Sequence, residues 1–242
     1  HARGTLLEGI VVVGTKSVEG TNVQDAPYSI TALTGDYIEH AGIKDVFDLQ
    51  QSIPGLIMGQ SQTSTTSNFS IRGIGTSSNN FGLESSVGLY VDGVYRSRQN
   101  SMINDLVDIN TIEVFRGPQG TLFGKNTPQG ALQVITKKPT FGDTDAFVEA
   151  TIGDYGLMKF SAASNYDLSS AYSNTALRAT FFSSKRDGYV EDIFSTDTWG
   201  GGALNDRDRF GVRLQLYSEP SDKLNFRIIV DRSEIDEACC VA

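Results

Sequence analysis

The sequence contains few of the side chains that build disulfide frameworks or metal centres. Its two cysteines, Cys239 and Cys240, are adjacent near the end of the chain, and its two histidines are His1 and His40. This supply offers neither a disulfide framework nor zinc-ligand spacing. We therefore expect no metal centre and no bound cofactor.

Long apolar runs and an excess of positive charge are also missing. The longest β-branched run covers only residues 10–13, far short of the ~18–20 apolar residues of a membrane-spanning helix. The net charge is −9, whereas a nucleic-acid partner requires a basic footprint. The first residues have no apolar core of a signal peptide, so an exported protein would be represented here by a mature or trimmed chain. A helical membrane protein and a nucleic-acid partner are excluded, but a membrane β-barrel, with strands of only ~9–11 residues, is not.

Composition and residue pattern divide the chain into three parts, and the first is a polar tail over residues 1–20. Its one β-prone stretch covers residues 7–14, where glycines and short polar residues surround the valines. Nothing adjacent offers a partner strand, and an isolated strand of this kind is unstable until it joins another sheet. The alternative is that this stretch forms the first strand of the domain that follows.

Residues 21–140 are predicted to form a compact α+β domain. A strand is expected over 26–33, with Thr34 capping a helix that ends near Gly42 and Asp45 opening a second helix over 46–52. Residues 59–68 have the composition of an exposed loop. Further strands are expected over 69–72, 87–91, 112–115 and 131–136. The pair Asp92–Gly93 predicts a hairpin turn.

Residues 141–242 show long alternation of apolar and polar side chains. Five amphipathic strands follow one another, over about 146–152, 156–168, 174–181, 209–216 and 224–231. Each strand has one face of apolar and small residues only, among them Met158 and Phe226. A membrane barrel produces this pattern by turning the apolar face to lipid and the polar face to the lumen, and short and long connections partly alternate as in such barrels. A soluble sandwich is the alternative.

Five strands cannot close a barrel, because two open edges in hydrocarbon would leave backbone groups unpaired at several kcal/mol each. We therefore expect further strands beyond residue 242 and read the sequence as the N-terminal portion of a larger protein.

Four segments in the middle domain carry a family resemblance. They read FSIRGIG at 69–75, VGLYVDGVY at 87–95, IEVFRGPQGTLFGKN at 112–126 and GALQVITKKP at 130–139. In this order they resemble the plug-domain motifs of TonB-dependent outer-membrane receptors. Residues 7–16 resemble the TonB box of that family.

The resemblance implies a fold and an activity. The fold is an α+β plug domain followed by the first strands of a transmembrane antiparallel β-barrel, 22-stranded in the family, in the outer membrane of a Gram-negative bacterium. The activity is active import of a scarce ligand, and the expected ligand class is a ferric siderophore or similar metal chelate. The implied partners are TonB with its inner-membrane energising complex, a small-molecule ligand and outer-membrane lipid.

The resemblance also implies functional residues. The TonB-binding strand comprises Glu8, Ile10, Val11, Val12 and Val13, whose main chain can pair edge to edge with a partner strand. Arg72 and Arg116 hold the plug through carboxylates on the barrel wall, since a guanidinium suits bidentate pairing; the alternative is a role inside the plug only. Ligand contacts are expected in the outward loops 59–68, 76–83 and 96–102. The candidate residues there are Asn79, Asn80, Phe81, Arg96, Arg98 and Gln99.

Enzyme interpretations fit poorly, and we expect no catalytic residues. Residues 120–125 resemble a phosphate-binding loop only superficially, because Gln119 stands where that motif needs glycine and Asn126 where it needs a hydroxyl. His40 is explained by helix-end chemistry, and the scattered carboxylates are expected to be solvated. The alternatives that remain are a receptor that mainly recognises or signals, and an importer of a saccharide or cobalamin.

Overall fold

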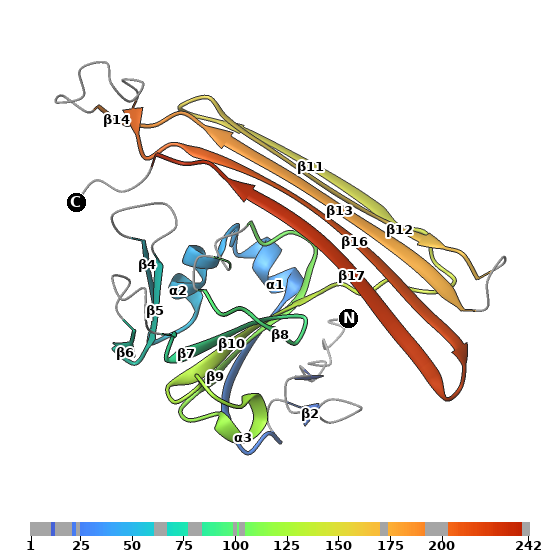
Figure 1. Ribbon diagram of the computed structural model, residues 1–242. Coiled ribbons are helices and arrows are strands. Elements are labelled where there is room, and N and C mark those ends of the chain that lie inside the picture. The colour runs from blue at the N-terminus through green and yellow to red at the C-terminus, as the bar shows by residue number, and fades with distance from the viewer. Residues whose placement is uncertain are drawn as a thin grey trace, which may run out of the picture.

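The structure is a computed structural model that describes residues 11–12, 21–22, 25–60, 67–76, 84–98, 101, 105–169, 174–191 and 203–238. Two bodies lie side by side in Figure 1: a small mixed sheet with short helices, and a long antiparallel sheet that runs diagonally past it. We call residues 25–140 the plug and the long sheet the wall. The predicted domain boundaries at residues 20 and 140 stay predictions.

The plug is built on two sheets. The larger has the strand order β3-β9-β10-β7-β8, and the smaller has the order β4-β5-β6. The strands are β3 (Ser29–Thr34), β4 (Leu56–Gln60), β5 (Ser67–Ile71), β6 (Ile74–Gly75), β7 (Val87–Val91), β8 (Val94–Tyr95), β9 (Ile109–Arg116) and β10 (Gly130–Thr136). Strand β10 runs parallel to β7 and antiparallel to β9. The four later strands predicted for the plug are therefore confirmed, and the strand predicted over 26–33 begins at Ser29.

Short helices connect these strands where the sequence places capping residues. They are α1 (Gly35–His40), η1 (Val46–Asp48), α2 (Leu49–Ser52) and α3 (Gly120–Phe123). Thr34 accepts a hydrogen bond from the Tyr37 N–H at 3.3 Å, and Asp45 forms a capping box with Asp48. The ring of His40 donates to the Asp36 carbonyl at 2.7 Å, which is the predicted helix-end role. No helix in the described ranges is long and apolar enough to span a bilayer.

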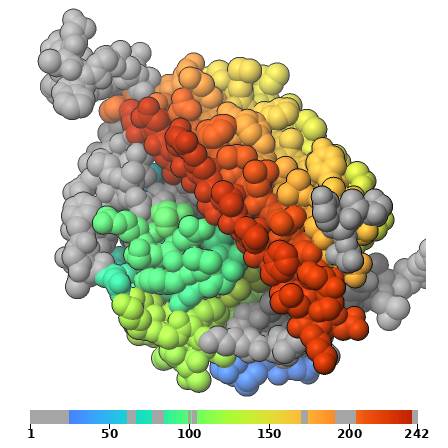
Figure 2. All heavy atoms as spheres, turned by 45° about the vertical axis from the view of Figure 1, so that its right-hand side comes forward, coloured from blue at the N-terminus to red at the C-terminus, as the bar shows by residue number. Residues whose placement is uncertain are grey.

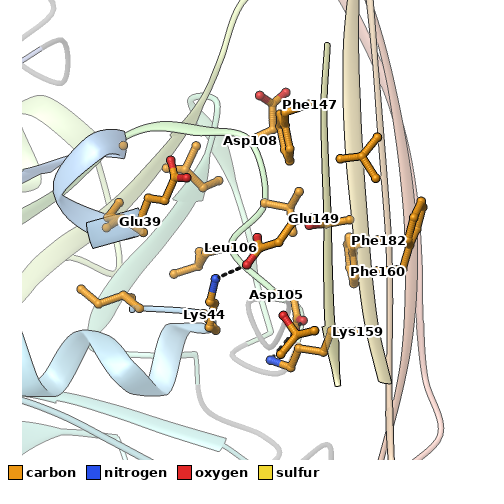
Figure 3. Close-up of a pocket in the computed structure, with 18 of the residues that line it drawn as sticks. Glu39, Lys44, Asp105, Leu106, Asp108, Phe147, Glu149, Lys159, Phe160 and Phe182 are labelled. Atoms are coloured by element: carbon orange, nitrogen blue, oxygen red, sulfur yellow. Dashed lines mark hydrogen bonds and ion pairs between the residues drawn. The ribbon is translucent and has the colours of Figure 1, made fainter. Parts of the chain in front are cut away.

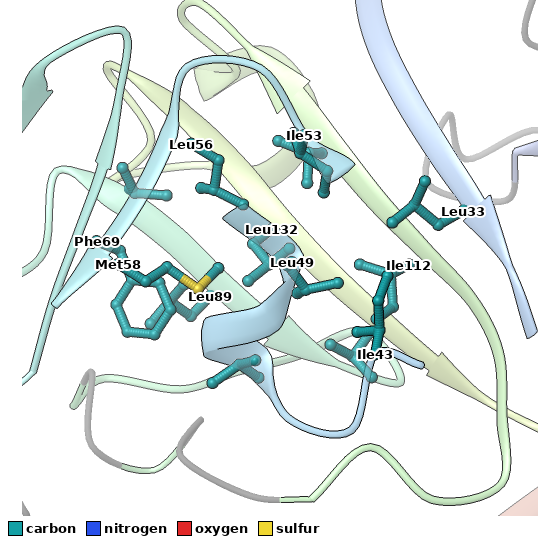
Figure 4. Packing of buried hydrophobic residues seen from close by; sticks show 14 of the residues in the cluster. Leu33, Ile43, Leu49, Ile53, Leu56, Met58, Phe69, Leu89, Ile112 and Leu132 are labelled. Atoms are coloured by element: carbon teal, nitrogen blue, oxygen red, sulfur yellow. The ribbon is translucent and has the colours of Figure 1, made fainter. Parts of the chain in front are cut away.

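The plug has an ordinary apolar core between its sheets and helices. Figure 4 shows this cluster, in which helix α2 lies over the strands. Phe69, Leu49, Leu89, Ile112 and Leu132 have no exposed surface. Burial of side chains this large contributes about 1.5–3 kcal/mol each, so the core stabilises the plug as it does a soluble domain.

The wall is the predicted set of five strands, joined in sequence order. They are β11 (Ala146–Gly153), β12 (Leu157–Asp167), β13 (Thr175–Arg186), β16 (Arg207–Ser221) and β17 (Leu224–Ile235). Every neighbouring pair is antiparallel. The connection from β13 to β16 holds a two-residue ladder of β14 (Val190–Glu191) and β15 (Ala203–Leu204). Alternating strand direction places this long connection, the turn at 154–156 and the segment after β17 at one end of the wall.

The two faces of the wall carry opposite kinds of side chain. On the face away from the plug, Val148, Ile152, Met158 and Val230 are 63–83% exposed, and Phe226 is 39% exposed. On the face toward the plug, the polar residues Arg178, Arg209 and Gln215 are at most 3% exposed. Figure 2 shows β17 crossing in front of the plug as one border of the wall. The apolar face therefore points outward, as predicted for a wall surrounded by lipid.

Two local predictions were wrong. The tail strand has a nearby partner, because Val11 and Val12 (β1) pair antiparallel with Thr21 and Asn22 (β2). Separately, the predicted loop 59–68 is strand at both ends, since β4 reaches Gln60 and β5 starts at Ser67. Both errors have one cause. These short strands pair through backbone hydrogen bonds, and such pairing leaves no periodic pattern of side chains in the sequence.

Candidate functional site

The interface between plug and wall is organised by buried ion pairs, of which Asp108 and Arg178 form the most enclosed. The Arg178 guanidinium donates from Nε at 2.7 Å and from Nη2 at 2.6 Å to the two oxygens of Asp108. The side chains are 3% and 0% exposed. The Thr180 hydroxyl donates to the same carboxylate at 2.9 Å. This bidentate geometry suits a guanidinium and fixes the orientation of both partners.

A second pair joins the wall to the turn between β7 and β8. Asp92 adopts a positive φ of 48°, with Gly93 at 79°, which is the predicted hairpin turn. The Asp92 carboxylate accepts from the Thr136 N–H at 3.0 Å and its hydroxyl at 2.9 Å. Arg227 of β17 lies 3.3 Å from the same carboxylate and also donates to the Thr136 hydroxyl. One aspartate thus holds a turn, the end of β10 and the wall together.

A third group lies around Arg209 of β16. It pairs with Asp45 and Asp105 of the plug, each at 3.4 Å, and Arg207 contacts Asp45 at 3.1 Å. Asp45 and Asp105 are themselves joined by a backbone bridge. This group connects η1 and the segment before β9 to the wall.

These contacts correct the expectation that the carboxylates are solvated. The side chains of Asp45, Asp92, Asp105 and Asp108 are at most 8% exposed. In the buried pairs the plug supplies the carboxylate and the wall supplies the cation. Removing either partner would leave a buried charge unpaired. The ion pairs therefore stabilise the one arrangement of plug and wall in which each buried charge meets its partner.

The side-chain amide of Asn165 holds the segment that connects the plug to the wall. Asn165 of β12 has no exposed surface. Its side-chain oxygen accepts from the Thr140 N–H at 3.0 Å, and its NH₂ donates to the Thr140 and Asp143 carbonyls at 2.9 and 2.7 Å. The connection that leads from β10 into β11 is therefore held against the wall.

A cavity of about 490 Å³ lies between the plug and β11, β12 and β13. Figure 3 shows Lys44 reaching Glu149 across it, at 2.6 Å, and Lys159 lying near Asp105, at 3.8 Å. Phe147, Phe160 and Phe182 add apolar surface to its wall side. A space of this size with charges of both signs suits water rather than a dry packed contact.

The two arginines predicted to hold the plug lie close together on it. Arg116 donates to the Thr31 hydroxyl at 2.7 Å and to the Pro54 carbonyl at 3.3 Å, both within the plug. Burial, and then the charge of Arg72, lower the pKa of Arg116. Arg72 is exposed, with a positive φ of 55°. Their pairing with barrel carboxylates stays a prediction, and the buried ion pairs between plug and wall use other residues.

The predicted ligand residues fall partly inside the described ranges. Arg96 follows β8 and lies 3.7 Å from Asp231 of β17, while Arg98 is exposed. Asn79, Asn80, Phe81 and Gln99 lie outside the described residues. The same holds for Glu8, Ile10 and Val13 of the tail, and for Cys239 and Cys240.

Sequence reasoning missed the wall arginines and their plug partners. Arg178 and Asp108 are separated by 70 residues, and neither belongs to a recognisable motif. The available signal was the position of Arg178, Arg209 and Arg227 on the polar face of strands whose other face is apolar. A charge on the enclosed face of such a strand needs a partner inside.

Comparisons with known proteins agree with this architecture. Residues 22–131 match the family model described as the TonB-dependent Receptor Plug Domain. Over 132 residues the chain is 30% identical to the pesticin receptor of Yersinia pestis, covering 54% of this chain and 19% of that receptor. Over 135 residues it is 27% identical to the catecholate siderophore receptor Fiu of Escherichia coli K12, covering 54% of this chain and 16% of that receptor. The matched stretch thus spans less than a fifth of the length of these relatives.

Solved structures resemble most of the chain. The ferric yersiniabactin uptake receptor FyuA from Yersinia pestis matches with a TM-score of 0.74 at 23% identity, over 85% of this chain and 31% of that one. The ferripyoverdine receptor of the outer membrane of Pseudomonas aeruginosa matches with a TM-score of 0.74 at 17% identity, over 93% and 27%.

The fold and the interface define a plug domain seated against the first strands of a β-barrel wall. The family match identifies residues 22–131 as a plug domain of the TonB-dependent receptors. The similar proteins named above are receptors, and the solved structures among them share the fold of most of the chain.

Proposed function

We propose that the whole protein imports a ferric siderophore across the outer membrane with energy delivered by TonB. The observation that carries this proposal is the plug itself, seated against the polar face of the wall by buried ion pairs. A body held this way blocks passage, so import requires work that shifts it. The names of the relatives supply the ligand class, since they include receptors for a catecholate siderophore and for ferric yersiniabactin.

The tail is the proposed point where TonB applies force. Residues 7–16 resemble the TonB box, and Val11 and Val12 form strand β1. A partner strand would add to β1 or take the place of β2, pairing main chain to main chain with Glu8, Ile10, Val11, Val12 and Val13. A pull along such a ladder loads several hydrogen bonds together and transmits force to the plug.

The outward loops are the proposed ligand contacts. Asn79, Asn80, Phe81 and Gln99 offer amides and an aromatic ring, and Arg96 and Arg98 add positive charge. Guanidinium groups suit an anionic chelate, which supports a ferric siderophore over a neutral saccharide. Arg72 and Arg116 are the proposed contacts with carboxylates elsewhere on the barrel.

Uptake of iron-55 by cells expressing the full-length receptor tests the proposal, with ferric yersiniabactin and a ferric catecholate as probes. Val11→Pro removes a ladder donor from the TonB box, and we expect it to abolish energised uptake while cell-surface binding stays normal. Ser17→Pro places the same residue in the tail outside the box and serves as the control. Normal uptake by Val11→Pro would contradict the proposal. Inhibition of this uptake by excess cobalamin or a saccharide, without inhibition by an excess of either unlabelled chelate, would contradict the proposed ligand class.

A further inference from the structure

One network of ion pairs at the plug–wall interface also includes a residue of the segment after β17. Its cations are Lys159, Arg207 and Arg209, all on the wall; its carboxylates are Asp45 and Asp105 on the plug and Glu237 after β17. Three positive and three negative charges balance. The network therefore joins three separate segments without a net buried charge.

Arg209 lies at the centre of this network and is 1% exposed. Its Nε donates to Glu237 at 2.5 Å and its Nη2 donates to the other oxygen of Glu237 at 3.3 Å. Its Nη1 lies 3.4 Å from both Asp45 and Asp105. The short two-point contact with Glu237 fixes the plane of the guanidinium, and that plane sets where the third nitrogen meets the plug.

Glu237 belongs to the segment that leaves the wall at the end where the long β13–β16 connection lies. The Asp236 N–H donates to the Asp208 carbonyl at 3.0 Å, and the Ala238 N–H donates to the Asp206 side chain at 2.5 Å. The Asn205 N–H donates to the Ala238 carbonyl at 2.7 Å. Residues 236–238 are therefore hydrogen-bonded to residues 205–208, while the Glu237 side chain is turned inward and is 3% exposed.

On the plug side, Asp45 has two tasks. One oxygen caps η1 by accepting from Phe47 N–H at 2.9 Å and Asp48 N–H at 3.3 Å, and the other faces Arg207 and Arg209. Val46 and Leu49, which follow the cap, are 1% and 0% exposed in the plug core. A change at Arg209 can therefore reach the core through the Asp45 carboxylate.

We propose that Arg209 is a positioning residue that couples the segment after β17 to the plug. While Glu237 holds the guanidinium, Asp45 stays in place and the η1 cap is complete. When residues 236–238 are displaced, Arg209 loses its fixed plane, the network carries an unbalanced positive charge, and the first turn after Asp45 loosens. The role in import rests on the proposed function, in which a ligand binds at the outward loops and the plug is then shifted.

Hydrogen exchange measured by mass spectrometry on the full-length receptor in detergent tests the coupling. Glu237→Gln removes the negative charge that pairs with the Arg209 guanidinium, and we expect amide exchange over residues 44–49 to accelerate by about tenfold or more. Glu234→Gln is the matched control, since Glu234 lies three residues earlier and pairs with exposed Arg232. We expect the control to leave exchange over 44–49 within about twofold of the parent.

The pattern of exchange separates coupling from general loss of stability. Residues 87–91, which form β7 and lie outside the network, should keep their protection in Glu237→Gln. Equal acceleration over 44–49 and 87–91, or no change over 44–49, would overturn the proposal. Arg209→Lys keeps the charge and loses the two-point contact, so it provides the same comparison if Glu237→Gln fails to fold. Because the measurement needs neither ligand nor TonB, its failure leaves proposed import untouched, and failed uptake leaves the coupling untouched.

Discussion

The plug buries its apolar side chains in its interior, whereas the wall exposes them on the face that points away from the plug. In the plug, Phe69 and Leu132 have no exposed surface and polar groups lie around the core. In the wall, Val148 and Ile228 are 69% and 52% exposed while Arg209 is 1% exposed. Both bodies are built on antiparallel or mixed sheets, so the difference is one of surroundings. A sheet turns its apolar face toward whatever excludes water, which is a core in one case and lipid in the other.

The largest expected effect comes from placing the same charge in each body. Leu132→Lys buries an unpaired ammonium in the plug core and should cost more than about 5 kcal/mol, enough to unfold the plug. Leu214→Lys makes the same change on the outward face of β16, where Leu214 is 48% exposed, and should cost about 2–4 kcal/mol. Urea unfolding of the full-length receptor, followed through protease resistance of the plug, measures both. Equal losses of unfolding free energy in the two variants would contradict the proposed difference between the surroundings of Leu132 and Leu214.

The next effect concerns the buried ion pair between the bodies. Arg178→Leu leaves the Asp108 carboxylate buried without its partner, which should destabilise the seated plug by about 3–5 kcal/mol. The double variant Arg178→Leu with Asp108→Leu removes both charges and should recover most of that loss. Thermal unfolding of the parent, single and double variants gives the comparison. A double variant as unstable as the single one would show that the charges are not coupled.

The smallest effect is expected at the exposed pair that crosses the cavity. Lys44 and Glu149 are 41% and 48% exposed, so solvent screens their attraction. Lys44→Gln should change the unfolding free energy by about 1 kcal/mol or less, and added salt should remove the difference. A loss as large as that of Arg178→Leu would place this pair among the buried contacts. Thermal unfolding at low and high salt distinguishes the two outcomes.

The sequence predicted what depends on local pattern. Alternation over 141–242 gave the five wall strands and the outward direction of Met158 and Phe226. Thr34 and Asp45 predicted the helix starts, and Asp92–Gly93 predicted the turn, because capping and turn geometry depend on neighbouring residues. The same logic missed β4, whose pairing with β5 gives no periodic signal.

The site was less predictable because its partners are far apart in sequence. Asp92 was predicted as a turn residue, yet its carboxylate also holds Thr136 and Arg227. Asp108 was expected to be solvated like the other carboxylates, and Arg178 was placed on the polar face of a strand without a predicted partner; the fold encloses both. Burial, not residue type, decides whether such a charge is solvated or structural, and burial is a property of the assembled fold. The functional roles of Arg72, Arg116 and the loop residues stay predictions.

The wall turns one face to lipid and the other to the plug. Ile228 and Ile229 are adjacent identical residues on opposite faces of β17, so they form a matched pair. We would replace each by cysteine in a full-length receptor carrying Cys239→Ser and Cys240→Ser, attach the same fluorophore and reconstitute into brominated lipid. We predict strong quenching at position 228 and weak quenching at 229. Equal quenching at the two positions, or stronger quenching at 229, would contradict the account.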